Sequence, residues 1–347
     1  MPHQILLLDT PRSGSHLLDR MIGHGTEIKH LDSPFSAARG KQIGWMLREG
    51  HEKGMTYQEG ADFTTALSAG ITKWREALSD AEDTVSPTTE DSTHSAQLTE
   101  QQGKTLFLKD HILNSSHGRE ILQIQYNYKS PSPHQDPTDP YPFLPAGANP
   151  TRIPDDLLLA LGTVPILLIR HPLCTIPSAM RVLQRMGLPH GGGRTNFRAV
   201  TSQDHTRVMY DFYRAHYNPS QAVMPLIVDY DDIATSQPFV RHLCTLLGLD
   251  PTEAKFSWPA LTAEGKREMH PSYYISQTRL KESSGVMPEL ATRNRDLEGE
   301  RKGWVKGWWR EFGREDVEMM EEMVGLAMPN YEWLWERRVR LPGGGEA

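Results

Sequence analysis

Residues 10–16, with the sequence TPRSGSH, are the first group whose types and spacing could do chemistry. An apolar run at residues 5–8 precedes them and apolar residues at helical spacing follow, which predicts a buried strand, a turn and a helix. Such a turn directs backbone N–H groups and Arg12 at one point, where the positive end of the helix dipole favours an oxyanion. We expect Ser13 or Ser15 to cap the helix. A capped turn with a surface arginine would have the same sequence.

A second predicted strand, at residues 105–108, ends next to Lys109 and His111. Ligands bind beyond the carboxyl ends of strands in open α/β sheets, so His111 would lie at a binding edge. An imidazole with an ordinary pKa of about 6.5 can remove a proton from a hydroxyl group at neutral pH. The chain has 15 histidines, and a surface histidine is the alternative interpretation.

A third predicted strand, at residues 165–169, is followed by Arg170, with Ser178 on the opening turn of the next predicted helix. Pro177 suits the first turn of a helix. A guanidinium can bind two phosphate oxygens while a hydroxyl and helix N–H groups bind the others. We therefore expect Arg170 and Ser178 to converge on one phosphate, with an unrelated salt bridge as the alternative.

Two later stretches are less specific by themselves. Tyr230 follows an apolar run at residues 225–228 and precedes an acidic turn, and a half-buried strand tyrosine would look the same. Arg301 and Lys302 stand before Gly303, where the backbone could pack close to a phosphate. A basic surface turn would have the same sequence.

The elements that must position these residues form an α/β pattern. Four apolar runs alternate with helical patterns, which predicts a parallel sheet with helices on both faces. We expect one domain over residues 1–341 and a disordered tail at 342–347. Residues 84–103 are polar and predict a mobile loop, and the proline-rich residues 128–151 predict an extended surface segment.

Composition excludes several classes of protein. There are 37 Lys and Arg residues against 44 Asp and Glu, a net charge of −7, and no long basic stripe, so nucleic acid is not an expected partner. No apolar run is long enough to cross a bilayer, which favours a cytoplasmic protein without a membrane partner. Two cysteines are too few for a disulfide framework or a cysteine-based zinc site. We expect no metal.

Taken together, the stretches resemble the motifs of PAPS-dependent sulfotransferases of the cytosolic type (PAPS is 3′-phosphoadenosine 5′-phosphosulfate). TPRSGSH is similar to their 5′-phosphosulfate loop, KDHI to their Lys-x-His segment, and YDDI to their Tyr-Glu-Asp-Leu segment. RKGWVKGWW is similar to their Arg-Lys-Gly motif, and the arginine and serine at 170 and 178 match their 3′-phosphate pair. The resemblance implies a P-loop-like fold that transfers a sulfuryl group from PAPS to a hydroxyl or amine.

The resemblance also implies a role for each residue. His111 would be the general base, with Lys109 and Arg12 stabilising the transferring group and the leaving phosphate. Four residues would hold the 5′ end of the donor: Ser13, Gly14, Ser15 and His16. Six would bind the rest of the nucleotide, mainly its 3′-phosphate: Arg170, Ser178, Tyr230, Arg301, Lys302 and Gly303.

Some positions depart from the family pattern. Leu17 stands where many members have a tryptophan that stacks on adenine, so Tyr230 or Tyr273 would have to take that part. Arg12 replaces a lysine and can bind phosphate oxygens but cannot act as a proton donor. His16 replaces a hydroxyl residue. The phosphate contacts are therefore expected to survive better than the base contacts.

The acceptor stays open at this point. The absence of a long basic cleft favours a small hydroxylated molecule, with Trp45, Tyr57 and Phe63 as candidate pocket walls and the glycine-rich residues 187–193 as a lid. A homodimer is also left open. Three alternatives remain: a catalytically idle protein that binds PAPS or its product, an ATP-using kinase, and an enzyme whose sulfate serves only as a leaving group.

Overall fold

The computed structural model describes residues 4–46, 56–82, 104–114, 147–217, 224–269, 271–292 and 297–343. The predicted mobile loop at 84–103, most of the proline-rich segment and the last residues of the tail lie outside these ranges. None of the described helices is long and apolar enough to cross a membrane.

Five parallel strands form one sheet in the order β2-β3-β1-β4-β5. They are β1 (Gln4–Asp9), β2 (Ile28–Asp32), β3 (Thr105–His111), β4 (Thr163–Ile169) and β5 (Leu226–Asp229). Four are buried apolar runs, as the sequence predicts. The fifth, β2, was not predicted, because its sequence IKHLD mixes polar and apolar residues, as suits an edge strand with only one neighbour.

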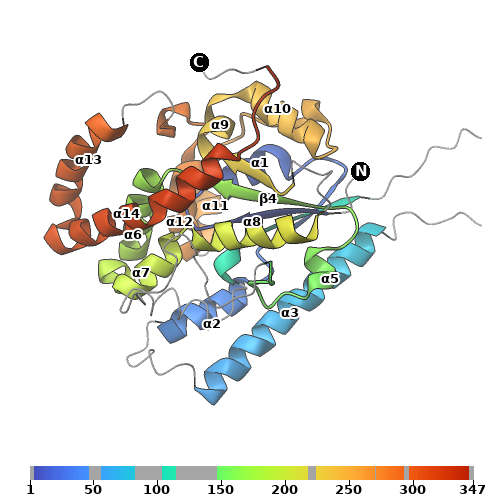
Figure 1. The fold of residues 1–347 in the computed structure, drawn as a ribbon, viewed down its shortest axis with the longest axis horizontal. Helices are drawn as coiled ribbons and strands as arrows, with labels where there is room; N and C mark the ends of the chain where they lie inside the picture. The colour runs from blue at the N-terminus through green and yellow to red at the C-terminus, as the bar shows by residue number, and fades with distance from the viewer. Residues whose placement is uncertain are drawn as a thin grey trace, which may run out of the picture.

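Helices cover both faces of the sheet, which confirms the predicted α/β architecture (Figure 1). Ile5 and Leu7 face one core cluster and Leu6 and Leu8 the other, because side chains alternate along a strand. The first cluster packs against α1 (Ser15–Ile22), α9 (Tyr230–Thr235) and α10 (Gln237–Leu246). The second packs against α2 (Ser36–Met46), α3 (Tyr57–Glu82), α5 (Asp155–Leu158) and α8 (Asp204–His216).

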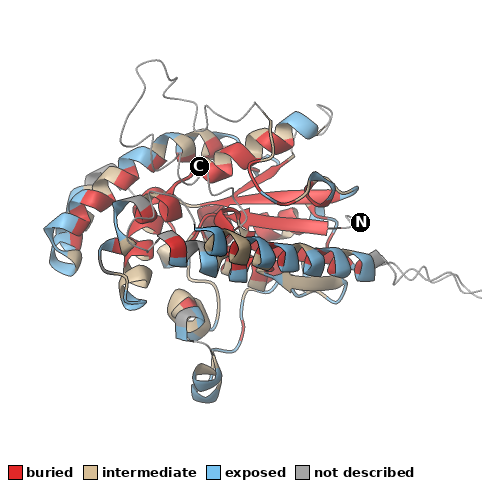
Figure 2. Ribbon diagram, turned by 90° about the horizontal axis from the view of Figure 1, so that it is seen from below, coloured by how far each residue is buried: buried red, intermediate tan, exposed pale blue. Residues whose placement is uncertain are grey.

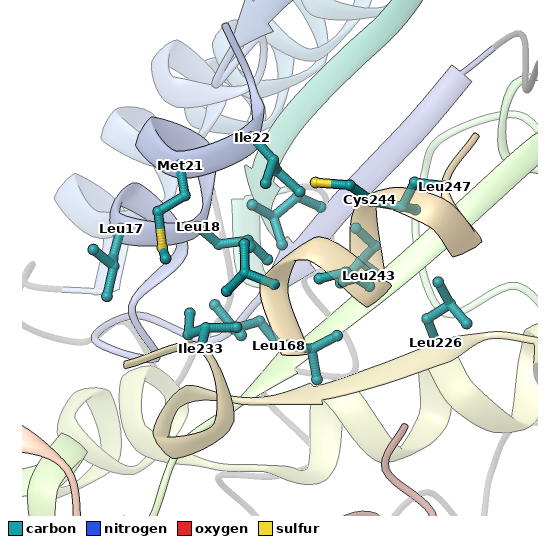
Figure 3. Close-up of a cluster of buried hydrophobic side chains, with 14 of the residues drawn as sticks. Leu17, Leu18, Met21, Ile22, Leu168, Leu226, Ile233, Leu243, Cys244 and Leu247 are labelled. Atoms are coloured by element: carbon teal, nitrogen blue, oxygen red, sulfur yellow. The ribbon is translucent and has the colours of Figure 1, made fainter. Parts of the chain in front are cut away.

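The first core cluster holds α1, and with it the loop that precedes α1, against the sheet. Figure 3 shows Leu18 and Ile22 of α1 directed toward Leu243 and Cys244 of α10, with Leu168 of β4 among them. Leu18 and Leu243 are fully buried. Burying an aliphatic side chain of this size contributes about 1.5–3 kcal/mol, so the start of α1 is firmly anchored.

The remaining helices lie mainly beyond the carboxyl edge of β4 and β5. A third cluster joins α6 (Pro172–Arg185), α7 (Arg194–Thr201), α13 (Leu297–Phe312) and α14 (Arg314–Glu336). Also present are α11 (Ala263–Glu268), α12 (Pro271–Glu282) and short 3₁₀ turns at Ile112–Asn114, Pro189–Gly192, Pro251–Glu253 and Pro288–Leu290. Figure 2 shows the buried residues along the strands and the exposed ones on outer helix faces.

One predicted helix start is wrong. The helix after β4 begins at Pro172 rather than near Pro177, so Pro177 and Ser178 lie inside α6 and not on its opening turn. Pro172 occupies the first turn, where its missing N–H costs nothing, and the ring of His171 accepts a hydrogen bond from the Leu173 N–H at 3.2 Å. This pair supplies the start signal that the sequence analysis assigned to Pro177.

Candidate active site

The loop between β1 and α1 has two residues in the left-handed conformation, which glycine adopts readily and arginine does not. Arg12 has a φ of 76° and Gly14 a φ of 101°, both in the left-handed region. A Cβ atom on Gly14 would lie 2.4 Å from Cδ2 of Tyr230, so only glycine fits. The glycine therefore allows the loop to pack directly against the ring of Tyr230, at the start of α9.

Neither serine caps α1 as expected. The N-cap residue is Gly14, which makes no side-chain cap hydrogen bond. The hydroxyl group of Ser13 instead donates a hydrogen bond to the carbonyl oxygen of Thr10, at 2.8 Å. The hydroxyl of Ser13 thus closes the turn, and no cap side chain covers the N–H groups at the start of α1.

Arg12 reaches across the sheet edge to α6 and α12. Its Nε donates to Oγ of Ser178 at 3.0 Å, and its Nη1 donates to the carbonyl of Ser276. Burial, followed by the charges of Arg170 and Arg279, lowers the pKa of Arg12 to about 10. Guanidinium groups that destabilise one another's charge in this way favour the binding of an anion between them.

Arg170 lies flat on an aromatic ring beside this loop. Its guanidinium carbon is 3.7 Å from the ring centroid of Tyr230, and its Nη2 donates to the carbonyl of Leu290 at 3.0 Å. Its buried Nε has no hydrogen-bond partner among the described residues. A buried donor left unpaired costs about 1–3 kcal/mol, which a bound acceptor oxygen would offset.

The structure therefore brings five of the predicted nucleotide-binding residues together. Gly14 and Arg170 contact Tyr230, and Arg12 joins Ser178 although Ser178 lies inside its helix. Tyr230 is only 4% exposed, so its ring supports Arg170 and Gly14 and does not present an open face to a base.

The predicted site at Arg301, Lys302 and Gly303 lies on another element, the helix α13. All three lie in α13, a continuous helix and not a turn, and Lys302 and Gly303 are exposed. A Cβ atom on Gly303 would meet no atom within 4 Å. Trp308, which is 5% exposed, packs α13 into the third core cluster and so sets the helix orientation.

His111 is paired with a carboxylate that the sequence analysis missed. Nδ1 of His111 lies 2.6 Å from Oδ1 of Asp9, and the two residues are register partners at the ends of β3 and β1. Asp9 is fully buried, whereas 17% of the His111 side chain is exposed. The carboxylate thus holds one ring nitrogen while the imidazole keeps an accessible side.

Lys109 is also held by an unpredicted carboxylate. Its Nζ lies 2.7 Å from Oδ1 of Asp32, the last residue of β2. Burial lowers the pKa of Lys109, but the charge and hydrogen bond of Asp32 raise it by more, so Lys109 stays charged. Tyr273 of α12 donates to Oδ2 of the same carboxylate at 3.0 Å.

His16 faces this group from the start of α1. Burial, followed by the charges of Lys109 and His111, holds the pKa of His16 well below its usual range. Its ring meets the ring of Tyr273 edge-on, with centroids 5.9 Å apart. His16 is therefore neutral at physiological pH and can offer a hydrogen bond but no charge.

The three aromatic residues proposed as pocket walls differ in how far they are exposed. Phe63 is 1% exposed and belongs to the second core cluster, whereas Tyr57 is 92% exposed. Trp45 is buried, and its indole N–H has no partner within the described part of the chain. In the glycine-rich loop, Nδ1 of His190 lies 2.9 Å from Oδ1 of Asp316, which ties the loop to α14.

Among the described residues, one group of three side chains brings possible metal-ligand atoms close together. Donor atoms of Asp19, His24 and His30 lie within 4.8 Å of one another. The group lies toward the C-terminal end of α1, whereas the loop that carries Arg12 precedes its N-terminal end. It takes no part in the arrangement around Arg12.

The sequence of this chain is similar to those of known proteins. No protein-family model matches the chain. The chain is 28% identical over 259 residues to sulfotransferase ppzF of Metarhizium rileyi, covering 72% of this chain and 74% of the relative. It is also 28% identical over 252 residues to sulfotransferase ppzF of Metarhizium majus, covering 70% and 72%.

Among solved structures, the sulfotransferase domain from the Synechococcus PCC 7002 olefin synthase aligns with 93% of this chain and 95% of its own. That alignment has 16% identity and a TM-score of 0.39. The two curated relatives are both sulfotransferases that match about 70% of the chain. Over this length the chain is similar to sulfotransferases.

Proposed function

We propose that this chain transfers the sulfuryl group of PAPS to a hydroxyl group of a small molecule. The relatives support sulfotransferase activity as the class of reaction. The observation that carries the donor is the convergence of Arg12, Arg170 and Ser178 beside the start of α1, with the buried Nε of Arg170 unpaired among the described residues.

The donor fits this group in one orientation. Its 5′-phosphosulfate would lie on residues 12–16, where Arg12 and the N–H groups at the start of α1 meet. Its 3′-phosphate would lie between Arg170 and Ser178, both close to Arg12. Tyr230 contributes by holding Arg170 in place. We assign the 3′-phosphate to these residues and leave α13 out, because Lys302 and Gly303 are exposed on that helix.

Catalysis would then need a base and fixed positive charge. His111 accepts the proton of the acceptor hydroxyl, while Arg12 and Lys109 offset the charge on the transferring group and the leaving phosphate. Sulfuryl transfer resembles phosphoryl transfer in its loose, in-line transition state, but the group carries less charge. Side-chain cations can therefore serve where phosphoryl transfer uses magnesium. A neutral His16 adds a hydrogen bond at the same place.

A thermal-shift experiment tests the donor. Adenosine 3′,5′-bisphosphate should raise the melting temperature, whereas ATP and AMP should not, because neither has a 3′-phosphate. Ligand at about 100 times its dissociation constant adds roughly 2.7 kcal/mol to stability, which makes the shift easy to detect. A shift with ATP and magnesium alone would instead identify an ATP-using kinase.

A turnover experiment separates an enzyme from an idle binder. Labelled PAPS should be consumed with at least one member of a panel of alcohols, phenols and amines. A thermal shift without consumption by any acceptor would favour a protein that only binds the nucleotide. Free sulfate released only in the presence of acceptor would show that the transferred group acts as a leaving group.

A further inference from the structure

Asp9 is a buried carboxylate that the nucleotide site does not explain. It is the last residue of β1, fully buried, and its Oδ1 lies 2.6 Å from Nδ1 of His111. Its other oxygen, Oδ2, has no hydrogen-bond partner among the described residues. Burying a carboxylate costs several kcal/mol unless it is paired, so a fold that keeps one here gains something from its contacts.

The surroundings of Asp9 are cationic on several sides. Its charge raises the pKa of Arg12, Lys109 and Arg39, in each case against the lowering caused by burial. Asp110, one residue from His111, makes its hydrogen bonds with other groups: its oxygens accept from the backbone N–H groups of Phe35 and His111 and from the side-chain amide of Asn114. Asp9 is thus the carboxylate that reaches the ring.

We propose that Asp9 is a positioning residue that makes Nε2 of His111 the proton acceptor. A carboxylate that accepts a hydrogen bond from Nδ1 places the imidazole proton there, which leaves the Nε2 lone pair free. It also stabilises the imidazolium that forms after proton transfer. The inference rests on the proposed function, because it assigns a partner to the base of that reaction.

The step balances without any further reagent. The acceptor oxygen forms a bond to sulfur while the bond between sulfur and the bridging oxygen of the 5′-phosphate breaks. The electron pair of that bond goes to the leaving phosphate, and the acceptor proton goes to Nε2 of His111. Asp9 keeps its negative charge throughout and faces an imidazolium afterwards.

The first test is a measurement on the unaltered protein. Heteronuclear NMR of the imidazole nitrogens, assigned with His111→Gln, should show His111 protonated at Nδ1 and bare at Nε2 at a pH where it is neutral. A proton on Nε2 would overturn the proposal. The measurement uses neither donor nor acceptor, so a failure to detect sulfuryl transfer would leave its result standing.

The second test compares two matched variants. Asp9→Asn keeps the side-chain shape but lets an amide N–H donate to Nδ1, which favours the wrong tautomer. Its kcat should fall roughly 100- to 10,000-fold, with the KM for PAPS little changed. Asp19→Asn makes the same change at another Asp–His contact of 2.6 Å, to His30, and should leave kcat within about twofold.

The pH profile completes the comparison. In Asp9→Asn the imidazolium is no longer stabilised, so the pH at which kcat rises should change. Nucleotide binding should stay the same. An Asp9→Asn protein with normal kcat, an unmoved profile and an unchanged His111 tautomer would refute the positioning role. If that variant does not fold, the tautomer of the unaltered protein decides alone.

Discussion

Two aspartate–histidine pairs with the same oxygen–nitrogen distance lie in different regions of this molecule. Asp9 and His111 meet at the carboxyl ends of adjacent strands, whereas Asp19 of α1 meets His30 of the edge strand β2, each pair at 2.6 Å. The first lies next to Lys109, which burial and Asp32 hold in place; the second stacks beside Phe107, with ring centroids 5.9 Å apart. The same interaction thus lies at the carboxyl edge of the sheet, where ligands bind in such folds, in one region and among packed side chains in the other.

The largest expected effect is on turnover at the carboxyl edge. His111→Ala should lower kcat by roughly two to four orders of magnitude, the usual range for a positioned proton acceptor, with the affinity for PAPS little changed. His30→Ala is the matched control and should leave kcat nearly normal. Steady-state kinetics with a fixed acceptor measures both. Near-normal turnover of His111→Ala would remove the distinction between the two pairs and make His16 the next candidate base.

The next effect is on nucleotide binding at the same edge. Arg170→Ala should weaken binding of adenosine 3′,5′-bisphosphate by roughly 2–5 kcal/mol, because a charge-paired contact is lost. Arg207 offers a control, since its guanidinium lies 3.4 Å from the ring centroid of Trp333 on α14 and should not touch nucleotide. Calorimetric titration of both variants is the measurement. Equal affinities would place the 3′-phosphate elsewhere.

A backbone change should have a smaller effect of the same kind. Gly14→Ala forces a Cβ atom to within 2.4 Å of Tyr230 at a φ of 101°, which should cost about 1–3 kcal/mol of stability and reduce the shift caused by nucleotide. Gly325→Ala in α14 meets no atom within 4 Å and should stabilise its helix slightly. Thermal denaturation with and without nucleotide distinguishes them. An unperturbed Gly14→Ala would show that the loop need not contact Tyr230.

The smallest effect concerns the packing pair. Burial alone would lower the pKa of His30, but the hydrogen bond and charge of Asp19 raise it by more, so its pKa lies above the usual value. The pair therefore stabilises the fold fully below about pH 6.5 and progressively less as the pH rises through the folded pKa. Asp19→Asn should cost at most about 1 kcal/mol, seen in melting curves at low pH and vanishing at high pH. A loss of equal size at both pH values would contradict the raised pKa.

Most of the sheet could be predicted because four strands are buried on both faces and read as apolar runs. The edge strand β2 could not, since its residues are half-buried and its sequence does not alternate. Arg170 follows one predicted strand, and Lys109 and His111 lie at the end of another, so the sequence could mark these residues as candidates. Their carboxylate partners, Asp9 and Asp32, were missed because a single aspartate at a strand end has no local signal, and its partner is brought close only by strand order.

The Arg301–Gly303 motif illustrates the opposite limit. Its residues were chosen by resemblance, with a basic surface turn as the alternative, whereas they lie inside a helix whose Trp304 and Trp308 pack in the third core cluster. Apolar residues at helical spacing occur both in helices that pack against a core cluster and in helices that lie beside a ligand. The sequence does not distinguish the two. Packing therefore decides where such a motif lies.

Helix α12 contacts both the Arg12 group and the Lys109 group at the carboxyl edge of the sheet. The carbonyl of Ser276 accepts from Arg12, and Tyr273 donates to Asp32, which in turn holds Lys109. A donor that needs Arg12 and Lys109 must displace their contacts with Ser276 and Asp32. Its measured affinity is therefore the free energy of the contacts that it makes minus that of the contacts that the protein loses. In the proposed reaction, release of the product would restore these internal contacts and so return the protein to its starting state.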